Sequence, residues 1–239
     1  MPILSLQSVS RSFGALKVTD DVSFDLNAGE ALGIIGPNGA GKSTLFNLIT
    51  GNIAPDQGRV LIDGRDVTRA PPMERVTAGI GRSFQIPQPF GGLSVYENLL
   101  VAARFGGNLG AAEAPRFCMD ILSRTGLAAV AEKPSGGLPL LQRKRLELAR
   151  AMATKPRVIL LDEIAGGLTD AECVELVGTI KAIHAEGTAI IWIEHVLHAL
   201  NSVVERLMVL NFGRMLMIGA PETVMASPEV KEIYLGIEA

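Results

Sequence analysis

The chain lacks several features that would place it in common protein classes. Only two of its 239 residues are cysteines, Cys118 and Cys173, which is too few for a disulfide scaffold and favours a reducing compartment. No run of about 18 uncharged apolar residues is present, so no membrane span is expected. The first residues contain no basic segment followed by an apolar one, so no signal peptide is expected either.

The chain also has no excess of positive charge. It has 22 lysines and arginines against 25 aspartates and glutamates, which gives a formal net charge of −3 at pH 7. A chain without a basic block is a poor candidate for binding nucleic acid through its phosphates, so no nucleic-acid partner is expected. The closest approach to such a block is Arg143–Arg145, for which we expect a solvated helix face.

Apolar runs alternate with helical patterns along the chain, which predicts an α/β fold. Residues 31–35, 158–161 and 189–193 are short, continuous apolar runs, as expected of parallel strands buried on both faces. The first thirty residues alternate apolar and polar side chains, a pattern typical of half-exposed antiparallel strands. Residues 206–218 are expected to form a β-hairpin.

Residues 88–150 follow a helical pattern instead. Ser94–Glu97 has the spacing of a capping box, and apolar residues then recur at helical intervals. We therefore expect one domain over residues 1–239. Its α/β core is formed by residues 1–87 and 151–239, with a mostly parallel sheet and an N-terminal antiparallel subdomain, and a helical subdomain is inserted at 88–150.

Residues 36–43 match G-x-x-x-x-G-K-[ST], the pattern of a phosphate-binding loop. Its glycines let backbone amides turn toward phosphate oxygens, and the helix that follows adds its positive end. Lys42 is expected to reach the β- and γ-phosphates, and the Ser43 hydroxyl to ligate Mg²⁺. An ordinary glycine-rich turn is the alternative. The residues predicted to bind the nucleotide here are Gly36, Pro37, Asn38, Gly39, Ala40, Gly41, Lys42, Ser43 and Thr44.

Two adjacent acids follow the apolar run at 158–161. Asp162 is expected to hold Mg²⁺ through water, and Glu163 to orient or deprotonate the attacking water. A solvated carboxylate is the alternative for Glu163. No Asn-Lys-x-Asp string is present to recognise guanine, which disfavours a GTPase.

With these two motifs, the sequence resembles the nucleotide-binding subunits of ABC transporters over nearly all of its length. The resemblance implies that the chain binds and hydrolyses Mg-ATP. It also implies that Phe13 stacks on adenine, that Gln85 senses magnesium and the attacking water, and that His195 contacts the γ-phosphate. For Phe13 the alternative is a buried phenylalanine at the end of a strand. For His195 the alternatives are a structural histidine or a metal site shared with Glu194 and His198.

Arg82–Gln85, Ile193–His195 and the tail Tyr234–Gly236 are similar to branched-chain amino acid import subunits, a group that includes relatives handling urea and short amides. This resemblance implies membrane permease subunits, a second ATP-binding subunit and, indirectly, a periplasmic solute-binding protein as partners. It also implies a peripheral position on the cytoplasmic side of the inner membrane.

The family's signature, Leu-Ser-Gly-Gly-Gln, is not intact in this chain. Ser135–Gly137 matches it locally. In the family, however, the signature serine lies at a fixed distance before the strand aspartate, and counting back from Asp162 places that serine at Pro139. Proline removes an amide donor there, and two leucines replace glycines that allow close backbone approach. The aligned signature, expected to face a partner's ATP, is Leu138, Pro139, Leu140, Leu141 and Gln142.

A homodimer would carry two damaged signatures, so a heterodimer with a related subunit is favoured and a homodimer is the alternative. Two other functions stay open: a soluble ATP-dependent dimerisation switch not coupled to transport, and a degenerate subunit with weak hydrolysis. The transported substrate cannot be derived from this chain, because selectivity resides in other subunits.

Overall fold

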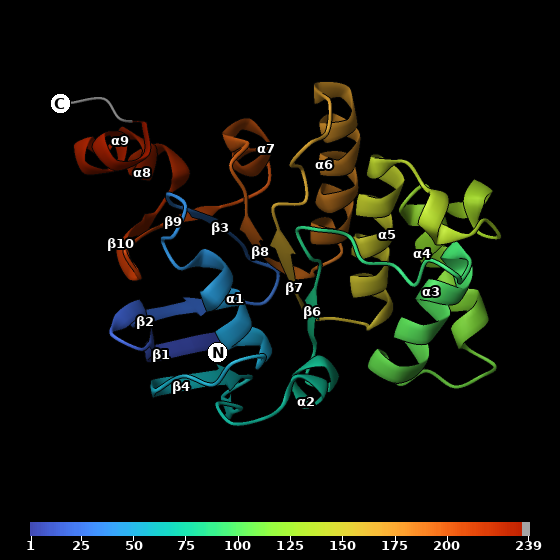
Figure 1. Cartoon of the computed structure of the whole chain (residues 1–239), viewed down its shortest axis with the longest axis horizontal. Coiled ribbons are helices and arrows are strands. Elements are labelled where there is room, and N and C mark those ends of the chain that lie inside the picture. The colour runs from blue at the N-terminus through green and yellow to red at the C-terminus, as the bar shows by residue number, and fades with distance from the viewer. Residues whose placement is uncertain (236–239) are drawn as a thin grey trace.

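The computed structural model describes residues 1–235, in which helices pack around two β-sheets (Figure 1). The strands are β1 (Leu4–Phe13), β2 (Leu16–Leu26), β3 (Ala31–Ile35), β4 (Gln57–Ile62), β5 (Arg65–Asp66), β6 (Ile80–Arg82), β7 (Val158–Asp162), β8 (Ala189–Ile193), β9 (Arg206–Asn211) and β10 (Arg214–Gly219). The α-helices are α1 (Lys42–Thr50), α2 (Pro72–Thr77), α3 (Val95–Val101), α4 (Ala114–Arg124), α5 (Leu140–Ala153), α6 (Asp170–Ala185), α7 (Leu197–Asn201), α8 (Pro221–Ala226) and α9 (Pro228–Leu235). The tail motif that ends at Gly236 extends outside the described residues.

The smaller sheet is antiparallel, with strand order β2-β1-β4-β5. Its first two strands confirm the expectation from the alternating pattern of the first thirty residues. Leu4, Leu6 and Val9 of β1 are buried, while Gln7 and Ser8 of the same strand are exposed. The sequence pattern did not predict β4 and β5, which extend this sheet.

The larger sheet has strand order β10-β9-β3-β8-β7-β6 and is parallel except where β10 pairs with β9. The three continuous apolar runs form β3, β7 and β8, and all their residues are buried as predicted. Because parallel strands end at the same edge, the segments after β3, β6, β7 and β8 emerge side by side. That edge carries the residues for which the sequence predicts chemistry.

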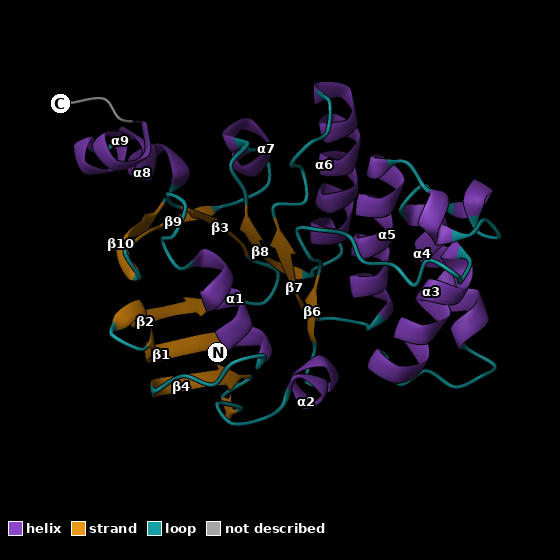
Figure 2. Cartoon of the chain, in the orientation of Figure 1, coloured by secondary structure: helices purple, strands orange, loops and turns teal. Residues whose placement is uncertain are grey.

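The sheet separates two apolar layers, and alternate residues of β7 illustrate the division. Val158 and Leu160 pack with helix α1 and the antiparallel sheet, whereas Ile159 and Leu161 pack with α5 and α6. Figure 2 shows α1 between the two sheets. Trp192 of β8 is fully buried in the second layer, as expected.

The insertion between β6 and β7 is helical, as its pattern predicts. Both hydrogen bonds of the capping box between Ser94 and Glu97 are present at the start of α3. A five-residue π-helical segment, Ala102–Gly106, continues α3. Helix α5 runs to Ala153, three residues past the expected subdomain boundary, and the division of the chain at 88–150 stays a prediction. Within residues 1–235, no helix is long and apolar enough to cross a membrane.

Candidate functional site

Five segments that are distant in sequence line one surface hollow of about 540 Å³. The loop from β3 into α1 forms one wall, and Val18 of β2 borders it. The residues that line the hollow are Val18, Asn38, Gly39, Ala40, Gly41, Lys42, Ser43, Thr44, Gln85, Glu163 and His195. The structure therefore brings most of the predicted nucleotide-binding residues together with three predicted catalytic ones.

The phosphate loop depends on glycine at its two ends. A Cβ on Gly36 would lie 2.2 Å from the carbonyl oxygen of Leu210, and one on Gly41, which has a φ of 98°, would lie 2.3 Å from that of Val18. No side chain caps the first turn of α1, and that turn contains no acidic residue. The amides and the positive end of the helix dipole are thus available to an anion, which fits a bound triphosphate.

Lys42 is buried beside this loop. Its Nζ donates to the carbonyl oxygens of Gly36 at 2.7 Å and Pro37 at 3.1 Å. Burial lowers the pKa of the ammonium, and the negative charges of Glu163 and Asp162 oppose that lowering. Since an ammonium has three hydrogens, one remains for a phosphate oxygen while the other two hold the loop.

Glu163 lies at the centre of a hydrogen-bonded group at the opposite wall. Gln85 Nε2 donates to Glu163 Oε2, and His195 Nε2 lies 3.0 Å from Glu163 Oε1. The three residues follow β6, β7 and β8, which are neighbours in the sheet. Strand order, rather than sequence distance, places an amide and an imidazole on the two oxygens of one carboxylate.

The magnesium ligands predicted from the sequence differ in position. Ser43 and Gln85 line the hollow and offer a hydroxyl and an amide oxygen, which are ligand types that Mg²⁺ accepts. Asp162 does not line it: the residue is 4% exposed, and its Oδ2 accepts from Arg82 at 2.8 Å. Ser43 and Gln85 therefore fit a magnesium ion, whereas a magnesium-holding role for Asp162 through water stays a prediction.

Arg82 is a residue whose role the sequence did not reveal. Besides Asp162 it donates to Asn47 Oδ1 at 2.6 Å, and its guanidinium lies over the rings of Phe46 and Phe84. It links helix α1 to the end of β7 behind the phosphate loop. Only the folded arrangement shows this, because the residues it joins are far apart along the chain.

Phe13 lies at the end of β1 and is 49% exposed, so the alternative of a buried phenylalanine is wrong. The Arg11 guanidinium lies 5.1 Å from its ring centroid. Phe13 is not among the residues that line the hollow. Its stacking on adenine stays a prediction.

The two segments that could align with the family's signature, Ser135–Gly137 and Leu138–Gln142, have different surroundings. Ser135 is fully buried, and its hydroxyl donates to the carbonyl of Phe90 and accepts from Asn98. That hydroxyl is therefore occupied inside the helical subdomain. The segment Leu138–Gln142 instead spans the start of α5, with Pro139 at the N-cap position and Leu140 exposed.

The expectation of a solvated face for Arg143–Arg145 is wrong for Lys144, which is 4% exposed. Its Nζ donates to the carbonyl oxygens of Gln85 and Glu163. Glu194, which the sequence suggested only as part of a metal site with His195 and His198, is a buried acid between β8 and His195. An acid directly after a buried strand was a detectable signal, whereas burial of Lys144 depends on how α5 packs.

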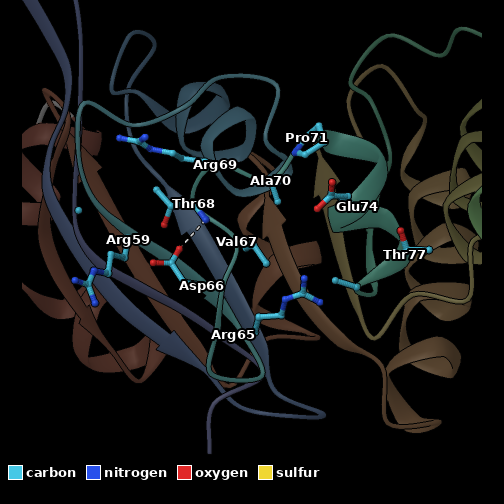
Figure 3. Close-up of a pocket in the computed structure, with 12 residues that line it drawn as sticks. Arg59, Arg65, Asp66, Val67, Thr68, Arg69, Ala70, Pro71, Glu74 and Thr77 are labelled. Carbon is cyan, nitrogen blue, oxygen red and sulfur yellow. Dashed lines mark hydrogen bonds between the residues drawn. The ribbon is translucent and has the colours of Figure 1, made fainter.

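A larger hollow of about 910 Å³ lies away from this edge, between β4, β5 and α2 (Figure 3). Three arginines border it, but Figure 3 shows Arg59, Arg65 and Arg69 directed to different sides rather than converging. Its drawn hydrogen bond, from the Thr68 amide to Asp66, is an internal turn contact. The hollow therefore presents no assembled site.

Comparison with known proteins shows similarity over most of the chain. A family profile described as "ABC transporter" matches residues 19–166. A probable ABC transporter ATP-binding protein of Azorhizobium caulinodans is 36% identical over 98% of this chain and 83% of its own length. The probable branched-chain amino acid transport protein LivG of Methanocaldococcus jannaschii is 33% identical, and the lipopolysaccharide export protein LptB of Haemophilus influenzae is 32% identical; each match covers 99% of this chain and 98% of the relative.

Solved structures show the same similarity. A nucleotide-free ATP-binding cassette from an ABC transporter superposes with a TM-score of 0.88 at 31% identity, covering 99% of this chain and 100% of that one. A cassette of an ABC transporter in its ADP conformation gives a TM-score of 0.87 at the same identity, with the same coverage.

Proposed function

We propose that this chain, which belongs to the ABC transporter family, drives an importer of branched-chain amino acids or related small polar solutes. As a member of that family it is an ATP-binding cassette that hydrolyses ATP, and such subunits work with membrane permease subunits. One observation carries the ATP-hydrolysing part of the proposal: the phosphate loop with Lys42 and the Gln85–Glu163–His195 group line the same hollow.

These residues divide the work of hydrolysis. The loop amides and Lys42 hold the triphosphate, and Glu163 accepts a proton from the attacking water. The water oxygen bonds to the γ-phosphorus as the bond to the β–γ bridging oxygen breaks, which releases ADP and phosphate. Gln85 and His195 keep the two oxygens of Glu163 in place, so catalysis is mainly positioning and charge stabilisation. Magnesium held by Ser43 and Gln85 would neutralise phosphate charge when bound.

The motifs at Arg82–Gln85 and Ile193–His195 support an importer of the branched-chain type, as does the likeness to LivG. The likeness to LptB is almost as high, so overall identity does not separate import from export. The proposal includes a periplasmic solute-binding protein as an indirect partner, and a peripheral position on the cytoplasmic side of the membrane.

Transport is tested by reconstitution with the permease and solute-binding proteins of a branched-chain amino acid importer. ATP hydrolysis in proteoliposomes should rise when the binding protein is loaded with leucine, isoleucine or valine, and labelled solute should accumulate in the compartment that exposes this chain. Stimulation by lipopolysaccharide instead of amino acids would contradict the substrate class. Hydrolysis that no membrane partner alters would favour the soluble dimerisation switch.

A surface beside the hollow supports the docking of a permease. Phe84, Ile86 and Phe90 are exposed along the loop after β6, next to Gln85. A recess of about 220 Å³ is lined by Phe84 together with residues of α2, β6 and α5. Apolar side chains exposed beside a recess are typical of a protein contact. Movement of a partner seated there would reach Gln85 directly.

We propose a heterodimer because Leu138–Gln142 lacks the features that let a backbone approach phosphate. The purified chain alone should hydrolyse ATP slowly, and a related subunit with an intact signature should raise the rate about tenfold or more. The variant Pro139→Ser/Leu140→Gly/Leu141→Gly should restore part of that rate to the isolated chain. A homodimer of the unchanged chain with a rate equal to that of the mixed dimer would overturn the proposal.

A further inference from the structure

Two buried, oppositely charged side chains lie beside the catalytic edge without pairing directly. Lys144 of α5 is 4% exposed and Glu194 after β8 is 1% exposed. Within residues 1–235, neither forms an ion pair with an opposite charge within 4.0 Å. A buried charge without a partner is costly, so their hydrogen bonds to the backbone are informative.

Lys144 joins two loops. Its Nζ donates to the carbonyl oxygen of Gln85 at 2.9 Å and to that of Glu163 at 3.1 Å. The side chains of those same two residues hydrogen-bond each other. The Lys144 ammonium therefore fixes the backbone of both Gln85 and Glu163, whose side-chain hydrogen bond orients the Glu163 carboxylate.

Glu194 joins two further segments. Its Oε2 accepts from the amide of Ala165 at 3.0 Å, two residues after Glu163, and its Oε1 accepts from the amide of His195 at 3.0 Å. The carboxylate thus links the loop that carries Glu163 to the loop that carries His195. Both of its oxygens are used on backbone groups.

The backbone of Glu163 needs such support. Its φ is 45°, in the left-handed region, which costs a residue with a Cβ about 1 kcal/mol. Its amide donates to the carbonyl of Ile193, and its carbonyl accepts from Lys144 and from Gly166. The surrounding contacts therefore determine a conformation that a glutamate would not adopt alone.

We propose that Lys144 and Glu194 are positioning residues that hold Glu163 in its hydrolytic orientation, the lysine from helix α5 and the glutamate from the His195 loop. The inference rests on the proposed function of Glu163. Burial lowers the pKa of the Lys144 ammonium, and the charge of Glu194 is the largest influence opposing that lowering. Because Lys144 lies one turn after Leu140, the first residue of α5, a displacement of the helix start moves both carbonyls that Lys144 holds.

The test compares Lys144→Met, which keeps the length of the side chain without its charge, with Lys144→Arg. We expect Lys144→Met to lower kcat about 10- to 100-fold with Mg-ATP affinity unchanged, and Lys144→Arg to recover part of that loss. Combined with Glu163→Gln, Lys144→Met should cause no further decrease, because the lysine acts through the glutamate. Lys181→Met, an exposed lysine of α6, is the matched control.

An unchanged kcat in Lys144→Met, or an equal loss in the Glu163→Gln background, would overturn the proposal. If Glu163→Gln alone kept full activity, the proposed role of Glu163 would fail instead. Should Lys144→Met unfold, Glu194→Gln serves the same test, since an amide nitrogen cannot accept the backbone hydrogen bond. A crystal structure provides a readout independent of activity: separation of Glu163 from Gln85 and His195 supports the proposal, and an unchanged group contradicts it.

Discussion

Glu163→Gln is expected to lower kcat for ATP hydrolysis about 10²- to 10⁴-fold, the usual contribution of a general base. The amide keeps the size of the carboxylate but cannot accept a proton from water. Mg-ATP should still bind, because Lys42 and the loop amides are unchanged, so the variant should accumulate in a nucleotide-bound, dimeric state. Single-turnover hydrolysis and size-exclusion chromatography with ATP measure the two effects.

Glu222→Gln is a suitable control for this experiment because Glu222 is an exposed glutamate of α8, away from the hollow. It should hydrolyse ATP at the unmodified rate. Full turnover in Glu163→Gln would remove this carboxylate from the proton transfer. Weak ATP binding in the variant would instead show that Glu163 contributes to the ground-state complex.

Lys42→Ala is expected to weaken Mg-ATP binding about 10- to 100-fold. The estimate follows from the contribution of a hydrogen bond to a charged group, about 1.5–3 kcal/mol, with about 1.4 kcal/mol for each factor of ten. The substitution also removes the donor that the carbonyls of Gly36 and Pro37 share. Isothermal titration calorimetry gives the affinity directly, and the rise in melting temperature on adding Mg-ATP should shrink accordingly.

Lys181→Ala removes an exposed positive charge elsewhere and should bind Mg-ATP normally. Without nucleotide, Lys42→Ala should melt somewhat below the unmodified chain, because the carbonyls of Gly36 and Pro37 lose their shared donor. Unchanged affinity in Lys42→Ala would overturn the assignment of residues 36–43 as the triphosphate site.

The central strands could be predicted because burial on both faces leaves a continuous apolar run. Residues 31–35 and 189–193 form β3 and β8 with the predicted bounds, and β7 extends the run at 158–161 by one residue. The short strands β5 and β6 gave no such signal, because two or three residues are too few for a pattern. These two strands form because they pair with the neighbouring strands β4 and β7.

The candidate site was predictable where one segment contains a whole function. The phosphate loop is contiguous, so its residues and the start of α1 follow from local spacing. Gln85 and His195 required a family resemblance, and Lys144 was predicted to be solvated. A charged residue on a helix is exposed or buried according to what the helix packs against, which local sequence does not contain.

By itself, the sequence determined the glycine-rich turn, the buried strands and the acid pair, because steric freedom and apolar periodicity act over a few neighbouring residues. The tertiary structure alone decided that the segments after β3, β6, β7 and β8 meet at one edge. It also decided that Arg82 pairs with Asp162, and that Lys144 and Glu194 support Glu163 from two sides. These contacts join residues far apart along the chain, and their distances are set by strand order and helix packing.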